Sequence, residues 1–116
     1  MPGTRKRKAI VHRLSKANLD ALVAEAVVDC HDEDEQRTGL LTMIQENLKL
    51  PFDTTVLGVP VQVQSIDFNK GGEVVAICVR GRDSQAVPIL DLPLPSLPPR
   101  GAEWIEAYRH WAAGWR

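Results

Sequence analysis

A run of acidic residues between positions 29 and 35 carries the strongest chemical signal in the sequence. Five of its seven residues are carboxylates: Asp29, Asp32, Glu33, Asp34 and Glu35. Crowded carboxylates repel one another unless a cation relieves the repulsion. Calcium suits such hard oxygen ligands because it accepts about six to eight oxygens in flexible geometry, whereas magnesium prefers fewer carboxylates and more water. These five residues are therefore the candidate metal ligands, and calcium is the candidate ion.

The acidic run does not have the spacing of an EF-hand. A loop that starts at Asp32 has Arg37 in place of the turn glycine and Met43 in place of the bidentate glutamate. A calcium site here needs further oxygens from backbone carbonyls, water or other loops. The alternative interpretation is a solvated helix start, because Asp32 and Glu35 have capping-box spacing and acids suit the positive end of a helix.

The other reactive residue types are scattered and favour neither zinc nor catalysis. Cys30 and Cys78 form no C-x-x-C pair, and adjacent residues such as Cys30 and His31 rarely reach one metal. The sequence contains no G-x-S-x-G, no phosphate-binding glycine loop and no H-E-x-x-H motif. We therefore expect no enzymatic activity. Two cysteines are too few for a disulfide scaffold, so a cytoplasmic protein with reduced thiols is the simplest interpretation.

The formal net charge of -1 combines a basic segment with an acidic remainder. Residues 1–16 contain six Lys and Arg residues and no acid, whereas residues 17–116 contain the other 8 basic residues and all 15 acids. We expect residues 1–14 to form a flexible basic arm. Four of its residues could contact nucleic-acid phosphates, solubilise the chain or fold back on the acidic domain: Arg5, Lys6, Arg7 and Lys8. The region 52–92 has only three basic residues, which argues against a nucleic-acid surface there.

Helices are predicted on both sides of the acidic run, within residues 15–50. Apolar residues recur at spacings of three and four before the run, from Leu19 to Val27, and after it, from Leu40 to Leu48. Ser15 is a suitable N-cap and Pro51 ends the helical region. Whether the two helices merge or break near residues 29–31 stays open at this point.

Short strands are predicted between residues 52 and 92. The segments rich in β-branched and apolar residues are 52–57, 59–68, 73–80 and 85–92, with turns at 69–72 and 81–84. Pro88 suggests an edge strand or a bulge. The expected fold is α+β: N-terminal helices, a small antiparallel, SH3-like, partly open β-barrel and a C-terminal helix. We expect residues 15–116 to form one domain.

The C-terminal part is predicted to contain a proline-rich connector over residues 93–100 and a helix over residues 101–114. An aromatic stripe repeats along this helix at spacings of four, three and four: Trp104, Tyr108, Trp111 and Trp115. In a chain of only 116 residues, such rings are expected to dock the helix onto the core. The alternative is an exposed stacking or ligand surface. No apolar run approaches the length of about 20 residues that a membrane span needs.

Four segments of the sequence resemble a known protein family. Residues 27–39, with the acidic run and Gly39, are followed at the right separation by the Pro-Phe step in residues 48–52. Residues 87–92 are similar to a late strand of that family, and residues 108–115 to its tryptophan-rich end. The family is that of the small calcium-binding proteins first known from cyanobacteria. The resemblance extends over about residues 22 to 115.

The resemblance implies a cytoplasmic, non-enzymatic protein that binds and buffers calcium through surface carboxylates. Carried over by position, the implied ligands are Asp29, Asp32, Glu33 and Glu35, with Asp34 beside them. The leading hypothesis is thus a calcium buffer or sensor. The second hypothesis is an interaction module in which the barrel or the aromatic stripe binds a protein, or the basic arm binds nucleic acid.

Overall fold

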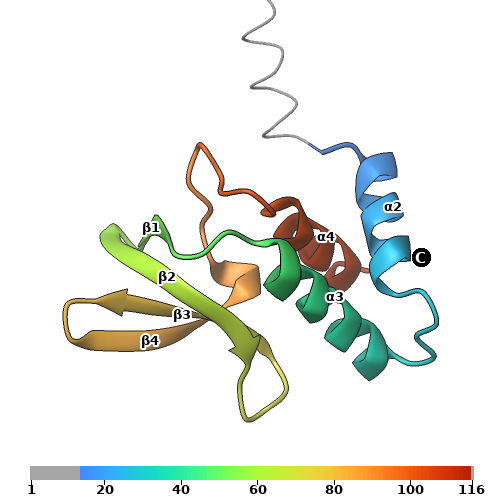
Figure 1. The fold of residues 1–116 in the computed structure, drawn as a ribbon, viewed down its shortest axis with the longest axis horizontal. Helices are drawn as coiled ribbons and strands as arrows, with labels where there is room; N and C mark the ends of the chain where they lie inside the picture. The colour runs from blue at the N-terminus through green and yellow to red at the C-terminus, as the bar shows by residue number, and fades with distance from the viewer. Residues whose placement is uncertain (1–13, 116) are drawn as a thin grey trace, which may run out of the picture.

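The computed structural model describes residues 14–115, which form a helical part at one end of an antiparallel sheet (Figure 1). The helices are α2 (Lys16–Ala26), α3 (Glu33–Asn47), the short 3-10 helix η1 (Ile89–Asp91) and α4 (Glu103–Ala112). The strands are β1 (Phe52–Val56), β2 (Val59–Phe68), β3 (Val74–Arg80) and β4 (Asp83–Pro88). This architecture confirms the predicted α+β class, with helices before and after the strands.

The first two helices are separate, which answers the question that the sequence left open. Ser15 is the N-cap of α2, and its hydroxyl oxygen accepts the Asn18 N–H at 3.0 Å. The helix ends at Ala26, and the chain turns before α3 begins at Glu33. Asp29 adopts a left-handed conformation in this turn, with φ 64°. A short polar side chain tolerates that region better than a branched one does.

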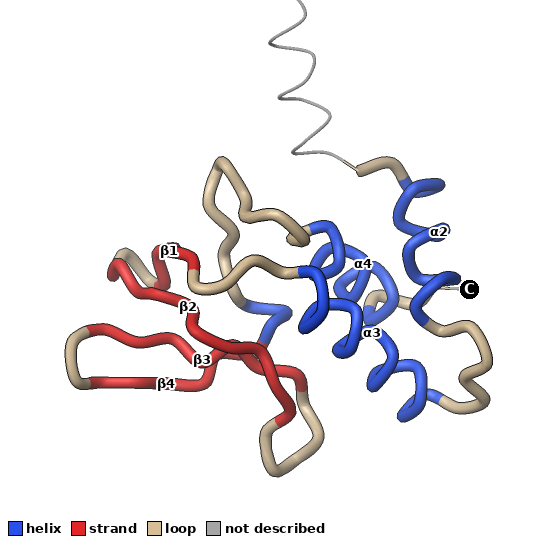
Figure 2. The backbone as a smooth tube through the Cα atoms, in the orientation of Figure 1, coloured by secondary structure: helices blue, strands red, loops and turns tan. Residues whose placement is uncertain are grey.

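The strands form one open antiparallel sheet in the order β1-β2-β3-β4 (Figure 2). Each strand pairs with its sequence neighbour, and β2 carries an irregularity between Val63 and Ser65. In the described part of the chain β1 and β4 do not pair with each other, so both are edge strands. Pro88 lies at the end of such an edge strand, as predicted. The finer likeness to an SH3-like barrel stays a prediction.

The prediction of a strand over residues 85–92 was wrong at both ends. Strand β4 begins at Asp83, two residues earlier, and residues 89–91 form the 3-10 helix η1. Pro88 cannot donate to a ladder hydrogen bond, which favours an end to the strand there. The side chain of Arg109 from α4 donates hydrogen bonds to the carbonyl oxygens of Ile89 and Leu92 and holds this turn in place.

Helix α4 is the centre of the helical part. It packs against α2, α3 and η1, and α3 in turn packs against β2. One continuous hydrophobic cluster includes fully buried side chains from all these elements, such as Val23, Ile44, Val63, Ile89 and Ile105. The cluster holds α3 and α4 in place against the sheet. It therefore sets the position of the acidic run at the start of α3.

Gly101 joins the start of α4 to the end of α3. Its φ is +88°, and an added Cβ would lie 2.1 Å from the carbonyl oxygen of Asn47. Beside it, the Lys49 N–H donates to the Arg100 carbonyl at 2.8 Å. Only glycine combines this conformation with so close a backbone approach.

Candidate calcium site at the start of α3

The first turn of α3 is built by two of the five predicted ligands. Asp32 is the N-cap, and its Oδ1 accepts the Glu35 N–H at 2.8 Å. Glu35 Oε1 accepts the backbone N–H of His31 at 2.6 Å. The predicted capping pair is therefore present, but Glu35 reaches the residue before the N-cap. Each carboxylate has a second oxygen, so capping still leaves these side chains able to bind a cation.

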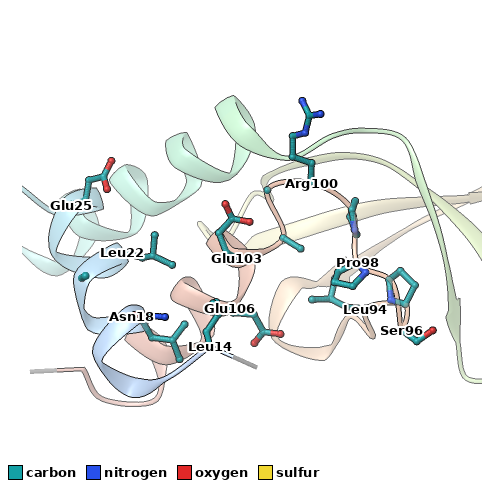
Figure 3. A pocket seen from close by; sticks show the side chains of 16 residues that line it. Leu14, Asn18, Leu22, Glu25, Leu94, Ser96, Pro98, Arg100, Glu103 and Glu106 are labelled. Carbon is teal, nitrogen blue, oxygen red and sulfur yellow. The ribbon is translucent and has the colours of Figure 1, made fainter. Parts of the chain in front are cut away.

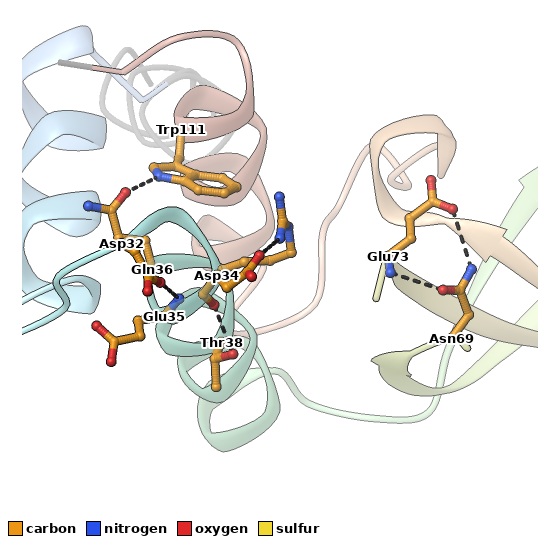
Figure 4. A network of polar contacts seen from close by, with 9 residues as sticks. Asp32, Asp34, Glu35, Gln36, Thr38, Asn69, Glu73 and Trp111 are labelled. Carbon is orange, nitrogen blue, oxygen red and sulfur yellow. Dashed lines mark hydrogen bonds and ion pairs between the residues drawn. The ribbon is translucent and has the colours of Figure 1, made fainter. Parts of the chain in front are cut away.

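A third acidic side chain is paired with a neighbouring arginine. Asp34 Oδ1 accepts a hydrogen bond from Arg37 Nη1 at 3.0 Å, and the Asp34 side chain is 92% exposed. The Arg37 guanidinium lies over the Trp111 ring, 5.4 Å from its centroid. Trp111 Nε1 in turn donates to Gln36 Oε1 at 2.9 Å (Figure 4). This network ties the acidic turn to α4.

The remaining two predicted ligands, Asp29 and Glu33, are exposed, and neither side chain has a hydrogen bond or ion pair to another residue within 14–115. Over the same residues, no three carboxylate, cysteine or histidine side chains converge to hold a metal ion. The acidic side chains thus surround the turn without forming a closed cage. Their oxygen chemistry fits calcium. The unpaired side chains of Asp29 and Glu33 can rotate toward an ion, whereas Asp32, Asp34 and Glu35 are held by hydrogen bonds.

A groove beside the acidic turn adds one acid that sequence reasoning missed. Asp32 and Glu33 line one wall, and Glu73 lines the other together with Gly71 and Gly72 of the β2–β3 turn. Asn69 Oδ1 shapes that turn by accepting the N–H groups of Gly71 and Glu73, both at 2.9 Å. The turn itself was predicted from its Asn-Lys-Gly-Gly sequence. No sequence signal places it opposite the start of α3.

Gly39 has a structural reason to be glycine. It lies on α3 where that helix crosses the end of α2, and an added Cβ would lie 2.4 Å from the Ala26 carbonyl oxygen. Cys30 is nearby and donates from Sγ to the Glu35 carbonyl at 3.4 Å. The glycine therefore allows the close helix approach that sets the position of the turn between α2 and α3.

The aromatic stripe of α4 is divided between core and groove. Trp104 and Tyr108 are 5% and 4% exposed, as predicted for core residues, and burial raises the pKa of Tyr108. Trp111 and Trp115 are partly exposed and line the groove beside Asp32 and Glu33. With Trp104 and Tyr108 buried, these two rings offer no surface to a protein partner.

The scattered cysteines and histidines have separate environments. Cys78 is buried in β3, and desolvation raises the pKa of its thiol. His110 Nε2 lies 2.7 Å from Asp20 Oδ1 and links α4 to α2. This hydrogen bond is the main reason why the pKa of Asp20 is lowered.

The predicted nucleic-acid contacts lie outside the described residues: Arg5, Lys6, Arg7 and Lys8.

Residues 14–115 thus combine a small α+β fold with an exposed acidic turn that lacks EF-hand spacing. The chain belongs to the CcbP family, described as calcium binding, whose match extends over residues 20–112. The fold is similar to the crystal structure of Anabaena CcbP, with a TM-score of 0.70 and 16% identity over 87% of this chain and 94% of that chain. A comparison with curated proteins found no match.

These findings confirm the resemblance read from the sequence, and with it calcium as the bound ion. In the described residues no helix is long and apolar enough to cross a membrane.

Proposed function

We propose that the protein is a non-enzymatic calcium buffer or sensor and that its ion lies at the turn that starts α3. The proposed ligands are the five predicted carboxylates: Asp29, Asp32, Glu33, Asp34 and Glu35. The observation that carries the assignment is their common exposure at one helix start, beside a groove whose far wall adds Glu73. The N-terminus of a helix carries a partial positive charge, which repels a cation. A calcium site there needs enough carboxylates to outweigh that repulsion, and the dense acidic run supplies the negative charge.

The assignment can be tested without breaking the helix start. In the triple variant Asp32→Asn, Glu33→Gln and Glu35→Gln, asparagine remains a good N-cap and glutamine can still form the capping bond, while three negative charges are lost. Calcium titration by calorimetry should show a loss of affinity of about tenfold or more, equal to about 1.4 kcal/mol. Circular dichroism should show an unchanged helix signal.

Glu46→Gln is the matched control, because Glu46 is an exposed acid of the same helix, beyond its first turn. It should bind calcium as the unmodified protein does. Terbium, which also prefers oxygen ligands, gives a second measurement, since Trp111 and Trp115 line the groove and can sensitise its luminescence. An unchanged affinity in the triple variant, or an equal loss in Glu46→Gln, would contradict the assignment.

A cytoplasmic location is part of the proposal. It is supported by Cys30 and Cys78, which are both free thiols in the structure. Disulfides are rare in reducing compartments, so unpaired cysteines are typical there.

The alternative, nucleic-acid binding through Arg5, Lys6, Arg7 and Lys8, stays a prediction. If this alternative holds, the full chain should be retained on a DNA or RNA column, and the retention should fall as the salt concentration rises. Replacement of these four residues by glutamine should abolish that retention. Retention that does not change would remove this alternative.

A further inference from the structure

A second groove lies on the other side of the helical part, away from the acidic turn. One wall is α2, and the other is the connector between η1 and α4, with the start of α4 between them (Figure 3). Its apolar surface comes from leucines, alanines and prolines, among them Leu22, Leu94 and Pro98.

The groove carries more acidic than basic residues. Glu25 lines it from α2, and Glu103 and Glu106 line it from α4. Arg100 is the one basic residue among the described residues that line it. Glu106 has a distant contact of 3.8 Å with Arg109, while Glu25 and Glu103 have no ion pair to any residue within 14–115. A segment that combines apolar and basic side chains would match this surface.

Such a segment directly precedes Leu14 in the sequence. Leu14, the first described residue, is itself part of the lining. The thirteen residues before it contain Ile10 and Val11, preceded by the basic run from Arg5 to Lys8 and followed by Arg13. Thirteen extended residues span about 40 Å, whereas the eleven residues of α2 are about 17 Å long. The segment is therefore long enough to follow the groove along the whole of α2.

We propose that this groove is the docking site of residues 5–13 of the same chain. Ile10 and Val11 cover its apolar surface, and the basic residues of the segment pair with Glu25, Glu103 and Glu106. The proposal is independent of the calcium assignment, because its acids belong to a different surface. It gives the basic residues an intramolecular partner that a nucleic acid or another acidic partner would have to displace.

Amide NMR spectra of the full-length protein test the proposal. The variant Ile10→Asp with Val11→Asp should shift the amide signals of residues 18–25 and 94–106, because the docked segment is released into solvent. The control, Pro2→Asp with Thr4→Asp, adds the same charge to the chain outside residues 5–13 and should leave those signals in place. Equal spectra for the two variants in this region would overturn the proposal.

Charge reversal on the groove gives the complementary measurement. Glu25→Lys with Glu103→Lys should move the amide signals of residues 5–13 toward random-coil positions. Glu46→Lys with Asp53→Lys, two exposed acids elsewhere, should not move them. The shifts should also be independent of protein concentration. A shift that grows with concentration would mean that the segment of a second copy occupies the groove, which contradicts docking within one chain.

Discussion

The two ends of α3 differ in burial: the second half packs in the core, and the first turn is exposed. Its second half contributes Leu40, Leu41 and Ile44 to the core, and the backbone at its end meets Gly101. Its first turn is exposed and is capped by the side chains of Asp32 and Glu35. The packed end fixes the helix in the fold, so the acidic end can present unburied charges to an ion. Stability and calcium binding should therefore respond to substitutions at opposite ends of one helix.

The largest loss of stability is expected from Gly101→Ala at the packed end. Its left-handed φ and the 2.1 Å approach to the Asn47 carbonyl oxygen together should cost about 3 kcal/mol or more in the free energy of unfolding. Urea unfolding measures this loss. The control is Gly58→Ala, because Gly58 has φ +78° and no atom within 4 Å of an added Cβ. It should lose only about 1 kcal/mol. Equal losses would show that the contact with Asn47 is unimportant.

Gly39→Ala should also destabilise the protein, although alanine in a helix normally stabilises it by about 1 kcal/mol relative to glycine. The Cβ would lie 2.4 Å from the Ala26 carbonyl oxygen, so α2 and α3 must separate. We expect a net loss of about 1 to 3 kcal/mol and weaker calcium binding, because the turn between the helices moves. Thermal unfolding and calcium titration measure the two effects. A stabilised variant would show that the helices are not in close contact here.

At the acidic end, Asp32→Ala and Asp32→Asn should separate stability from ion binding. Alanine removes the N-cap and should cost about 1 kcal/mol, whereas asparagine keeps the cap. Both substitutions remove the charge, and both should weaken calcium binding. The melting temperature and the calcium affinity are measured on the same samples. Normal calcium binding by Asp32→Asn would show that the charge of Asp32 is not needed to bind the ion, and would contradict this prediction.

The smallest effect is expected from the link between α2 and α4, which lies at neither end of α3. Because the hydrogen bond from His110 lowers the pKa of Asp20, the folded state binds the Asp20 proton more weakly than the unfolded state does. The resulting stabilisation is present above the ordinary pKa of 3.8 and is lost as the pH falls further. Acid unfolding should therefore depend less on pH below this value in Asp20→Asn. Parallel pH profiles for the two proteins would contradict this.

Local sequence signals predicted the acidic helix start better than its surroundings. Ser15, Asp32 and the turn at Asn69 act through neighbours within a few residues, so their roles could be read from spacing. The position of Glu73 could not, because it depends on how the sheet packs against α3. The close approaches at Gly39 and Gly101 join residues that are distant along the chain, for the same reason.

The difference between local signals and long-range contacts also explains the wrong prediction for residues 85–92. Their apolar composition suits a strand, but the chain leaves the sheet after Pro88. Arg109, about twenty residues further on, binds the carbonyl groups that the sheet no longer uses. An apolar segment can be buried as a turn when a distant side chain satisfies its backbone. The periodicity of the segment alone does not contain that information.

The turn between β1 and β2 offers a site for attachment. Leu57 has a left-handed φ of 51° and is 96% exposed, so neither packing nor intrinsic preference requires leucine there. Figure 1 places this turn at the opposite end of the molecule from α2 and the first turn of α3. A peptide tag inserted between Leu57 and Gly58 would tether the protein to a sensor surface with both grooves facing the solution.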